Sequence, residues 1–410
     1  MALINENFYK LRSSYLFPEV RRRVAHFTDQ RPGLNITNLG MGDVVLPLAS
    51  TVTAAMKAAV EELESPDTFK GYGPVQGYDF LRNAILEQDY ASRGVQLSPD
   101  EIFISEGSKS DCGNLQELFS VDARVAIADP VYPVYVDSNV MAGRTGVLRA
   151  DRRYERLVYL PCREETGFVP EPPSETVDFV YLCSPNNPTG AVMNRQQLTD
   201  WVRWAQRTHA ILLFDAAYEA FIGDADLPHS IYEIDGARVC AIEMRSFSKS
   251  AGFTGVRCGF TVIPKDVMGY GSDGKGTSLH SLWSRRYATK YNGTSYIVQR
   301  GAAAVYTPAG RKETSVQVAF YMDNARIMRQ KLLQMGFQVW GGENAPYVWM
   351  ATKGSKSSWD FFDRMLAEAL VIGTPGIGFG PSGEGYYRLS AFSMREGLED
   401  ALIRIERAFG

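Results

Sequence analysis

Ser246-Phe-Ser-Lys-Ser-Ala-Gly-Phe-Thr-Gly-Val-Arg257-Cys-Gly259 is the stretch of this sequence that says most about the fold. Lys249 stands between small hydroxyl residues shortly after the apolar run 239–242, and Arg257 follows eight residues later among glycines. A lysine amine held in such a turn can attach to an aldehyde, while hydroxyl groups and a guanidinium can hold a phosphate. Taken alone, the stretch also fits a Ser/Gly loop with a solvated lysine, because a short motif match is only a hypothesis.

Two more polar clusters stand directly after apolar runs upstream. Ser184-Pro-Asn-Asn-Pro-Thr-Gly190 follows the run 179–183, and Asp215-Ala-Ala-Tyr218 follows the run 211–214. Short apolar runs that end in turn residues indicate buried strands. Because polar clusters end three successive strands, they can converge on one crevice of an open α/β sheet. The cofactor pyridoxal phosphate (PLP) carries an aldehyde and a phosphate on one aromatic ring. Binding it needs a lysine amine and phosphate-binding groups in one place.

The order of apolar patterns predicts an α/β fold. Strand patterns at 102–105 and 125–128 alternate with helical patterns, at about 51–64, 78–90 and 108–119 and again after Asn194. Such alternation is typical of parallel βαβ units, so we expect a mostly parallel central sheet with helices on both faces. The chain has 410 residues and 45% hydrophobic content, which is enough for a large core and two domains.

The last part of the chain has a different pattern. A long helical stretch at about 312–335 leads to strand-like and helical segments, at 337–340, 347–350, 359–369 and 386–391, and to a final amphipathic helix. This pattern indicates a smaller α/β domain. We predict a large PLP-binding domain of residues 48–294, and an N-terminal arm plus small C-terminal domain made of residues 1–47 and 295–410.

Composition excludes several classes of function. The net charge of −4 argues against a dedicated nucleic-acid binder, which usually has a basic face. Five cysteines without CxxC spacing and four scattered histidines predict a reduced protein without a metal site. No segment approaches 18 uninterrupted apolar residues and no apolar signal core begins the sequence, so we expect a cytoplasmic protein that does not contact a membrane.

Together these motifs resemble those of the fold-type-I (class I/II) PLP-dependent aminotransferases over nearly the whole chain. Within that family the sequence is most similar to LL-diaminopimelate aminotransferases. The segments that carry the closer resemblance are Tyr15–Glu19, Gly40–Asp43, Gly71–Gly73, Glu106–Lys109, Asp129–Pro133, Ser246–Gly259, Tyr291–Gly293, Asn344–Tyr347 and Thr374–Gly380.

Several residues have a chemical reason to bind PLP. Lys249 would attach to the aldehyde and, once freed, carry a proton between substrate and cofactor. Asp215 ends a buried strand, where a carboxylate is costly unless it is paired, and a protonated pyridine nitrogen would be its partner; the alternative is a turn or helix cap. Asn187 and Tyr218 can donate hydrogen bonds to the phenolic oxygen of the ring, although Asn187 also fits an ordinary turn.

Other residues would hold the phosphate and the ring. Donors are expected from a helix start and from the motif quoted first, namely Ser108, Lys109, Ser246, Ser248 and Arg257. Tyr132, which follows Asp-Pro, is expected to stack on or flank the ring, although an aromatic residue there is otherwise an ordinary core residue.

The resemblance implies further site residues. Arg388 matches the arginine that binds the α-carboxylate of the substrate through two parallel hydrogen bonds. Positions that match substrate contacts of the family are Tyr15, Gly42, Lys109, Tyr132 and Asn187. Tyr72 and Asn292 match positions that reach the site from the other subunit, so the resemblance implies a homodimer with a shared active site.

The activity implied is reversible transfer of an amino group from LL-2,6-diaminopimelate to 2-oxoglutarate, which gives tetrahydrodipicolinate and glutamate. This reaction is a step of lysine and cell-wall precursor synthesis. Val75 departs from the pattern, because relatives often carry an acidic residue there that can contact the distal ammonium of the substrate. Alternatives are an aminotransferase for aspartate, an aromatic amino acid or lysine, a PLP lyase of the same fold, and a regulatory protein without catalysis. Regulators of this kind usually add a DNA-binding domain, and the roughly 45 residues before the large domain are too few for one.

Overall fold

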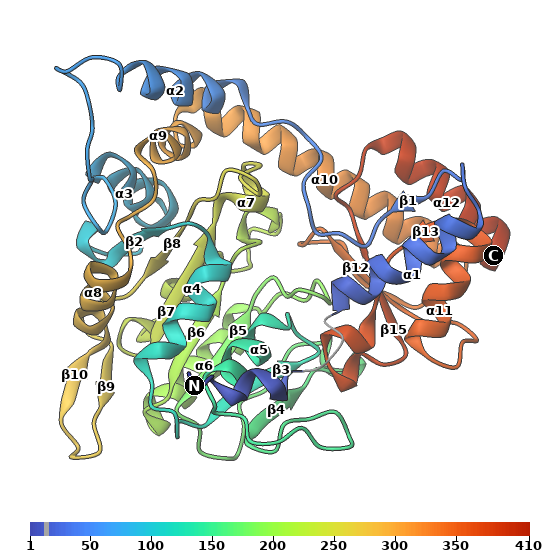
Figure 1. Ribbon diagram of the computed structural model, residues 1–410, viewed down its shortest axis with the longest axis horizontal. Helices are drawn as coiled ribbons and strands as arrows, with labels where there is room; N and C mark the ends of the chain where they lie inside the picture. Colours follow the sequence, from blue (N-terminus) through green and yellow to red (C-terminus); the bar gives the residue numbers. More distant parts are fainter. Residues whose placement is uncertain (12–15) are drawn as a thin grey trace.

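The computed structural model describes residues 1–11 and 16–410, and it contains one large sheet and one smaller sheet with helices around each (Figure 1). The larger sheet has seven strands, in the order β2 (Ile102–Ser105), β8 (Gly259–Val262), β7 (Ala241–Ser246), β6 (Ile211–Asp215), β5 (Phe179–Cys183), β3 (Val125–Asp129) and β4 (Leu157–Pro161). Strand β8 is antiparallel to both of its neighbours, whereas the contacts from β7 through β4 are all parallel. The predicted mostly parallel sheet is confirmed.

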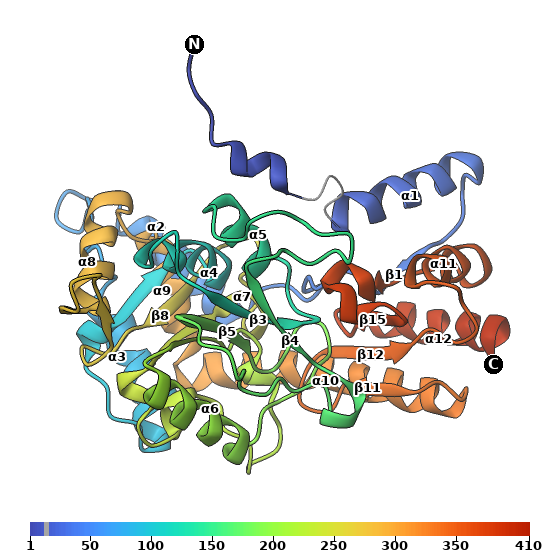
Figure 2. The same ribbon diagram turned by 90° about the horizontal axis from the view of Figure 1, so that it is seen from below.

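Helices cover both faces of this sheet, as alternation of the buried strand residues requires. One face packs against α3 (Asp79–Ile85), α6 (Arg195–Thr208) and α9 (Tyr296–Val305). The other face packs against α4 (Ser108–Leu115), α5 (Val134–Met141) and α8 (Leu279–Lys290). Figure 2 shows the two layers, with α6 on one side of the strands and α4 and α5 on the other.

The smaller domain is built on a four-stranded antiparallel sheet. Its order is β11 (Val339–Gly341), β12 (Tyr347–Ala351), β15 (Tyr386–Ser390) and β14 (Thr374–Pro375). Helices α11 (Ser358–Arg364) and α12 (Arg395–Phe409) contribute to its core, and α10 (Pro308–Gln334) runs to it from beside the large sheet (Figure 1). The domain limits at residues 48 and 295 stay a prediction.

The N-terminal part of the chain joins the smaller domain. Strand β1 (Thr37–Asn38) pairs in parallel with β13 (Val371–Ile372), and α1 (Leu16–Gln30) packs against the core of this domain. The chain then enters the large domain through α2 (Ser50–Glu61), which packs on α9. A hairpin of β9 (Met268–Tyr270) and β10 (Gly276–Ser278) projects from the large domain (Figure 1).

Some element limits differ from the predicted ones, for physical reasons. Helix α10 begins at Pro308, because the side chain of Thr307 accepts a hydrogen bond from Gly310 N, and proline is favourable at the first helical position. Strand β7 continues to Ser246 through two buried charged residues, Glu243 and Arg245, which bind each other at 2.8 Å. The expected helix at 78–90 is α3 followed by a π-helical turn, Leu86–Tyr90.

All five cysteines are buried and free. Within residues 1–11 and 16–410, no helix combines the length and the apolar character needed to cross a bilayer.

Candidate active site

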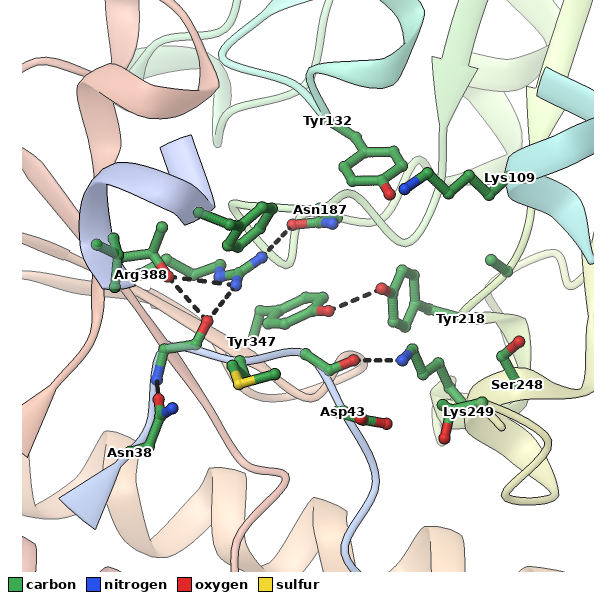
Figure 3. Close-up of a pocket in the computed structure, with 18 of the residues that line it drawn as sticks. Asn38, Asp43, Lys109, Tyr132, Asn187, Tyr218, Ser248, Lys249, Tyr347 and Arg388 are labelled. Atoms are coloured by element: carbon green, nitrogen blue, oxygen red, sulfur yellow. Dashed lines mark hydrogen bonds between the residues drawn. The ribbon is translucent and has the colours of Figure 1, made fainter. Parts of the chain in front are cut away.

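A cavity of about 760 Å³ lies at the carboxyl ends of β5, β6 and β7, where the large sheet faces the smaller domain. Most of the predicted site residues line it, and they are Gly42, Ser108, Lys109, Tyr132, Asn187, Asp215, Tyr218, Ser246, Ser248, Lys249, Arg257 and Arg388. Figure 3 shows Lys249, Tyr218, Asn187 and Arg388 arranged around this common space. Polar groups from three strand ends therefore meet, as the sequence pattern predicts.

Lys249 is held in a single helical turn at the end of β7. Ser246 caps this turn, α7 (Phe247–Ser250), by accepting a hydrogen bond from Ser248 N at 3.1 Å. The amine of Lys249 donates to the backbone oxygen of Gly42. Burial lowers the pKa of Lys249 to about 8, against the opposing charge of Asp43 and with help from two arginines of the cavity. The lowered pKa favours the neutral amine more than in an exposed lysine.

Asp215 is a buried carboxylate with a defined set of donors. The phenol of Tyr135 donates to it at 2.6 Å and the backbone N–H of Ala217 at 3.0 Å, while the thiol of Cys112 lies 3.4 Å away. Burial raises the pKa of Asp215, and these hydrogen bonds partly oppose the rise. A cation next to this carboxylate would stabilise its ionised form.

A concave set of donors lies where α4 begins. Arg257 has a left-handed backbone, with φ of 72°, and its guanidinium donates to the Ser248 hydroxyl at 3.2 Å. A Cβ on Gly107, the residue before α4, would lie 2.5 Å from this guanidinium, so glycine is what lets the arginine reach the start of the helix. Free backbone N–H groups, a hydroxyl and a guanidinium together form an anion site.

Arg388 reaches the cavity from β15, on the smaller domain. Its side chain is 1% exposed, and its guanidinium donates to Asn187 Oδ1 and to Gly40 O, both at 2.6 Å. It also lies over the rings of Tyr347 and Phe379, at 4.5 and 4.8 Å. No carboxylate within the described ranges pairs with this arginine, and burial lowers its pKa. A buried cation without an anion is costly, which makes this point of the cavity a strong site for a carboxylate.

Tyr347 contributes to the site and was not predicted to do so. Its hydroxyl lies 2.7 Å from the hydroxyl of Tyr218, and a side chain on Gly42 would collide with it. Tyr135, Asp43 and one face of α1 also line the cavity without having been predicted. Tyr135 stands three residues after Tyr132 in the same Asp-Pro segment, which is the one sequence signal that could have found it.

Three predicted residues are not placed in the cavity. Tyr72 is 94% exposed and Asn292 is exposed, and neither lines the cavity of this single chain. Tyr15 lies outside the described residues.

The fold and the cavity agree with the comparison to known families. Residues 35–405 match the family model described as aminotransferase class I and II, so the chain belongs to the class I and II aminotransferases. This family uses PLP.

Several solved structures match over the whole chain. The L,L-diaminopimelate aminotransferase of Chlamydomonas reinhardtii is 42% identical, with 100% of this chain and 99% of that chain covered and a TM-score of 0.93. The substrate-bound BacF structure from Bacillus subtilis is 26% identical, with 100% and 99% covered and a TM-score of 0.83. The Thermus thermophilus aspartate aminotransferase with maleate is 23% identical, with complete coverage of both chains and a TM-score of 0.83, and it shares the fold.

Proposed function

We propose that this chain is an LL-2,6-diaminopimelate aminotransferase. It would reversibly transfer an amino group from LL-2,6-diaminopimelate to 2-oxoglutarate, giving tetrahydrodipicolinate and glutamate. The observation that carries the choice of substrate is the 42% identity, over both whole chains, to an enzyme of that name. The observation that supports transamination is that a lysine, a buried aspartate and a buried arginine surround one cavity, and that the arginine has no acidic partner among residues 1–11 and 16–410.

The residues of the cavity fit PLP. The start of α4 with Ser248 and Arg257 offers donors to a phosphate, and the absence of a Cβ at Gly107 keeps that space open. Asp215 would pair with the ring nitrogen, because its buried carboxylate holds neutral donors and lacks a cation among the described residues. When bound, PLP accepts the electron pair released as the substrate loses its α-proton.

The remaining cofactor contacts follow from the same arrangement. Ser108, Lys109 and Ser246 line the cavity and would donate to the phosphate, and Tyr132 would flank the ring. Asn187 and Tyr218 would donate to the phenolic oxygen; the Tyr218 hydroxyl is held by Tyr347.

Lys249 would act as the base. Its neutral amine would take the proton from the substrate α-carbon, hold it and release it again during the transfer. A pKa of about 8 suits this work, because the group gains and loses a proton near the pH of the cell. Arg388 would bind the substrate α-carboxylate and so orient the α-proton toward Lys249.

We also propose a homodimer in which Tyr72 and Asn292 complete the site of the partner subunit. Both side chains are exposed here and lie away from the cavity of their own chain, which is the arrangement that such sharing requires.

A second candidate function is an aminotransferase for another amino acid. Val75, whose side chain packs against apolar neighbours, supplies no charge to bind a distal ammonium group. The absence of a charge at this position would also suit aspartate or an aromatic amino acid as the amino donor. The experiment below also tests lysine as a donor, and it tests whether the protein catalyses a PLP-dependent elimination instead of transfer.

The test is a kinetic panel with 2-oxoglutarate as acceptor and LL-diaminopimelate, meso-diaminopimelate, lysine, aspartate and an aromatic amino acid as donors. We expect the LL isomer to have the highest kcat/KM. Val75→Glu should change KM for diaminopimelate more than KM for glutamate. Lys249→Ala should lose transfer and the borohydride-sensitive absorbance band. A higher kcat/KM for another donor, or release of ammonia without transfer, would replace the proposed function by the second candidate.

A further inference from the structure

One face of helix α1 lines the cavity that holds Lys249 and Arg388. The lining residues recur at intervals of three and four, which places them on one side of the helix. They are Phe17, Pro18, Val20, Arg21, Val24 and Ala25. Arg21 is the one charged side chain among these six.

Helix α1 is fixed to the smaller domain. The guanidinium of Arg23 binds Asp363 Oδ2 at 2.5 Å and lies 4.4 Å over the ring of Trp359. Val20 and Val24, which line the cavity, also pack against the core of the same domain. Arg21 and Arg388 therefore belong to one body, with a fixed spacing between them.

The three consecutive arginines of α1 do not share the same partners. Arg22 and Arg23 both bind Glu19, at 2.7 and 2.8 Å. Their hydrogen bonds lower the pKa of Glu19 to about 2, so this carboxylate stays ionised and engaged. Arg21 faces the cavity instead and has no acidic partner in the part of the chain that the structure describes.

The charges that line the cavity leave room for a second carboxylate. Among the described residues that line the cavity, basic side chains outnumber acidic ones, with Arg21, Lys109, Lys249, Arg257 and Arg388 against Asp43 and Asp215. The proposed phosphate and α-carboxylate use Arg257 and Arg388. With a monocarboxylic substrate bound, the cavity keeps an excess of positive charge. A second carboxylate on the substrate would reduce this excess.

We propose that Arg21 binds the distal carboxylate of the substrate and thereby selects dicarboxylic amino acids and 2-oxo acids over monocarboxylic ones. The inference rests on the proposed function, because glutamate, 2-oxoglutarate and diaminopimelate each carry a carboxylate far from the reacting carbon. A planar guanidinium matches a carboxylate through two N–H donors. With Arg388 on the same body, Arg21 sets the distance between the two carboxylates that the site accepts.

The experiment compares two ligands of the PLP-loaded enzyme that differ in one group. Glutarate carries both carboxylates, and butyrate lacks the distal one. Their dissociation constants are measured from the change in cofactor absorbance for wild type, Arg21→Ala, Arg21→Lys and Arg22→Ala, the last being a matched control on the solvent side of the same helix. This readout requires no turnover, and circular dichroism checks that each variant is folded.

Wild type should bind glutarate more tightly than butyrate. Arg21→Ala should weaken glutarate about tenfold and butyrate less than twofold, since a hydrogen bond to a charged group contributes about 1.5 kcal/mol or more. Arg21→Lys should recover part of the loss, and Arg22→Ala should match wild type. In turnover, Arg21→Ala should raise KM for glutamate while kcat stays within about twofold.

Three results would overturn the inference. Equal weakening of both ligands would show that Arg21 supports packing of α1, and an unchanged affinity for glutarate, or no preference for it in wild type, would show that the charge is not used. If glutarate selection depends on Arg21 while LL-diaminopimelate is not a substrate, the inference stands and the proposed substrate is wrong.

Discussion

Substitution of Arg388 tests the core of the proposed site. Its two terminal nitrogens are each held at 2.6 Å by a neutral acceptor, Asn187 Oδ1 or Gly40 O, so the guanidinium is oriented but its charge is not neutralised by the described residues. A substrate carboxylate would gain two charge-assisted hydrogen bonds of about 1.5–3 kcal/mol each. Arg388→Ala should therefore lower kcat/KM for glutamate by roughly 10²–10⁴-fold.

The conservative variant gives the sharper result. Arg388→Lys keeps the charge but offers one compact donor group instead of a planar pair, so about half of the binding energy should be lost, or about 10–100-fold in kcat/KM. The assay is the single-turnover reaction of the PLP-loaded enzyme with glutamate, followed by absorbance. Arg329→Ala, an arginine of the same domain that does not line the cavity, serves as control. Wild-type rates in Arg388→Lys, or less than a threefold loss in Arg388→Ala, would refute this reasoning.

Gly107→Ala should weaken PLP binding at least about tenfold, because its backbone has φ of 128° and the new Cβ would lie 2.5 Å from a guanidinium of the anion site. An absorbance titration measures this, and Gly113→Ala, which meets open space on the same helix, should bind PLP as wild type does. Arg245→Met should lower the free energy of unfolding by about 3–5 kcal/mol, since two glutamates bound at 2.8 and 2.9 Å lose their cation; denaturant midpoints equal to wild type would count against it. The cofactor-free protein should gain up to about 3 kcal/mol of stability between pH 8 and 10.5, because below pH 8 the folded chain bears the full cost of the buried Lys249 ammonium and above 10.5 neither state is charged. Urea unfolding at both ends of that range should show no such gain for Lys249→Met.

Much of the large sheet could be predicted from local sequence. Strand β5 has the predicted limits and β6 is longer by one residue, because continuous apolar runs bounded by turn residues leave few alternatives for a buried segment. Strand β7 was harder to predict beyond Ile242, since Glu243 and Arg245 look like surface residues. They are buried because they neutralise each other, and that pairing depends on neighbours that the local pattern does not reveal.

The cavity could be predicted only in part. Lys249, Asp215 and Asn187 stand at strand ends, where parallel packing brings them together, and the structure places all three around one cavity. Tyr135 and Tyr347 read as ordinary aromatic residues, and their hydroxyl contacts appear only once the chain is folded.

The sequence by itself determined the class of the fold and the chemical groups at three strand ends, because the apolar period and the turn residues are local properties of the chain. Only the tertiary structure decided that Arg388 would donate to Asn187, 201 residues away, and that α1 would place Arg21 at the same cavity. The physical reason is that the packing of the smaller domain and α1 against the strand ends is set by many weak contacts between distant segments, and no short stretch of sequence specifies their sum.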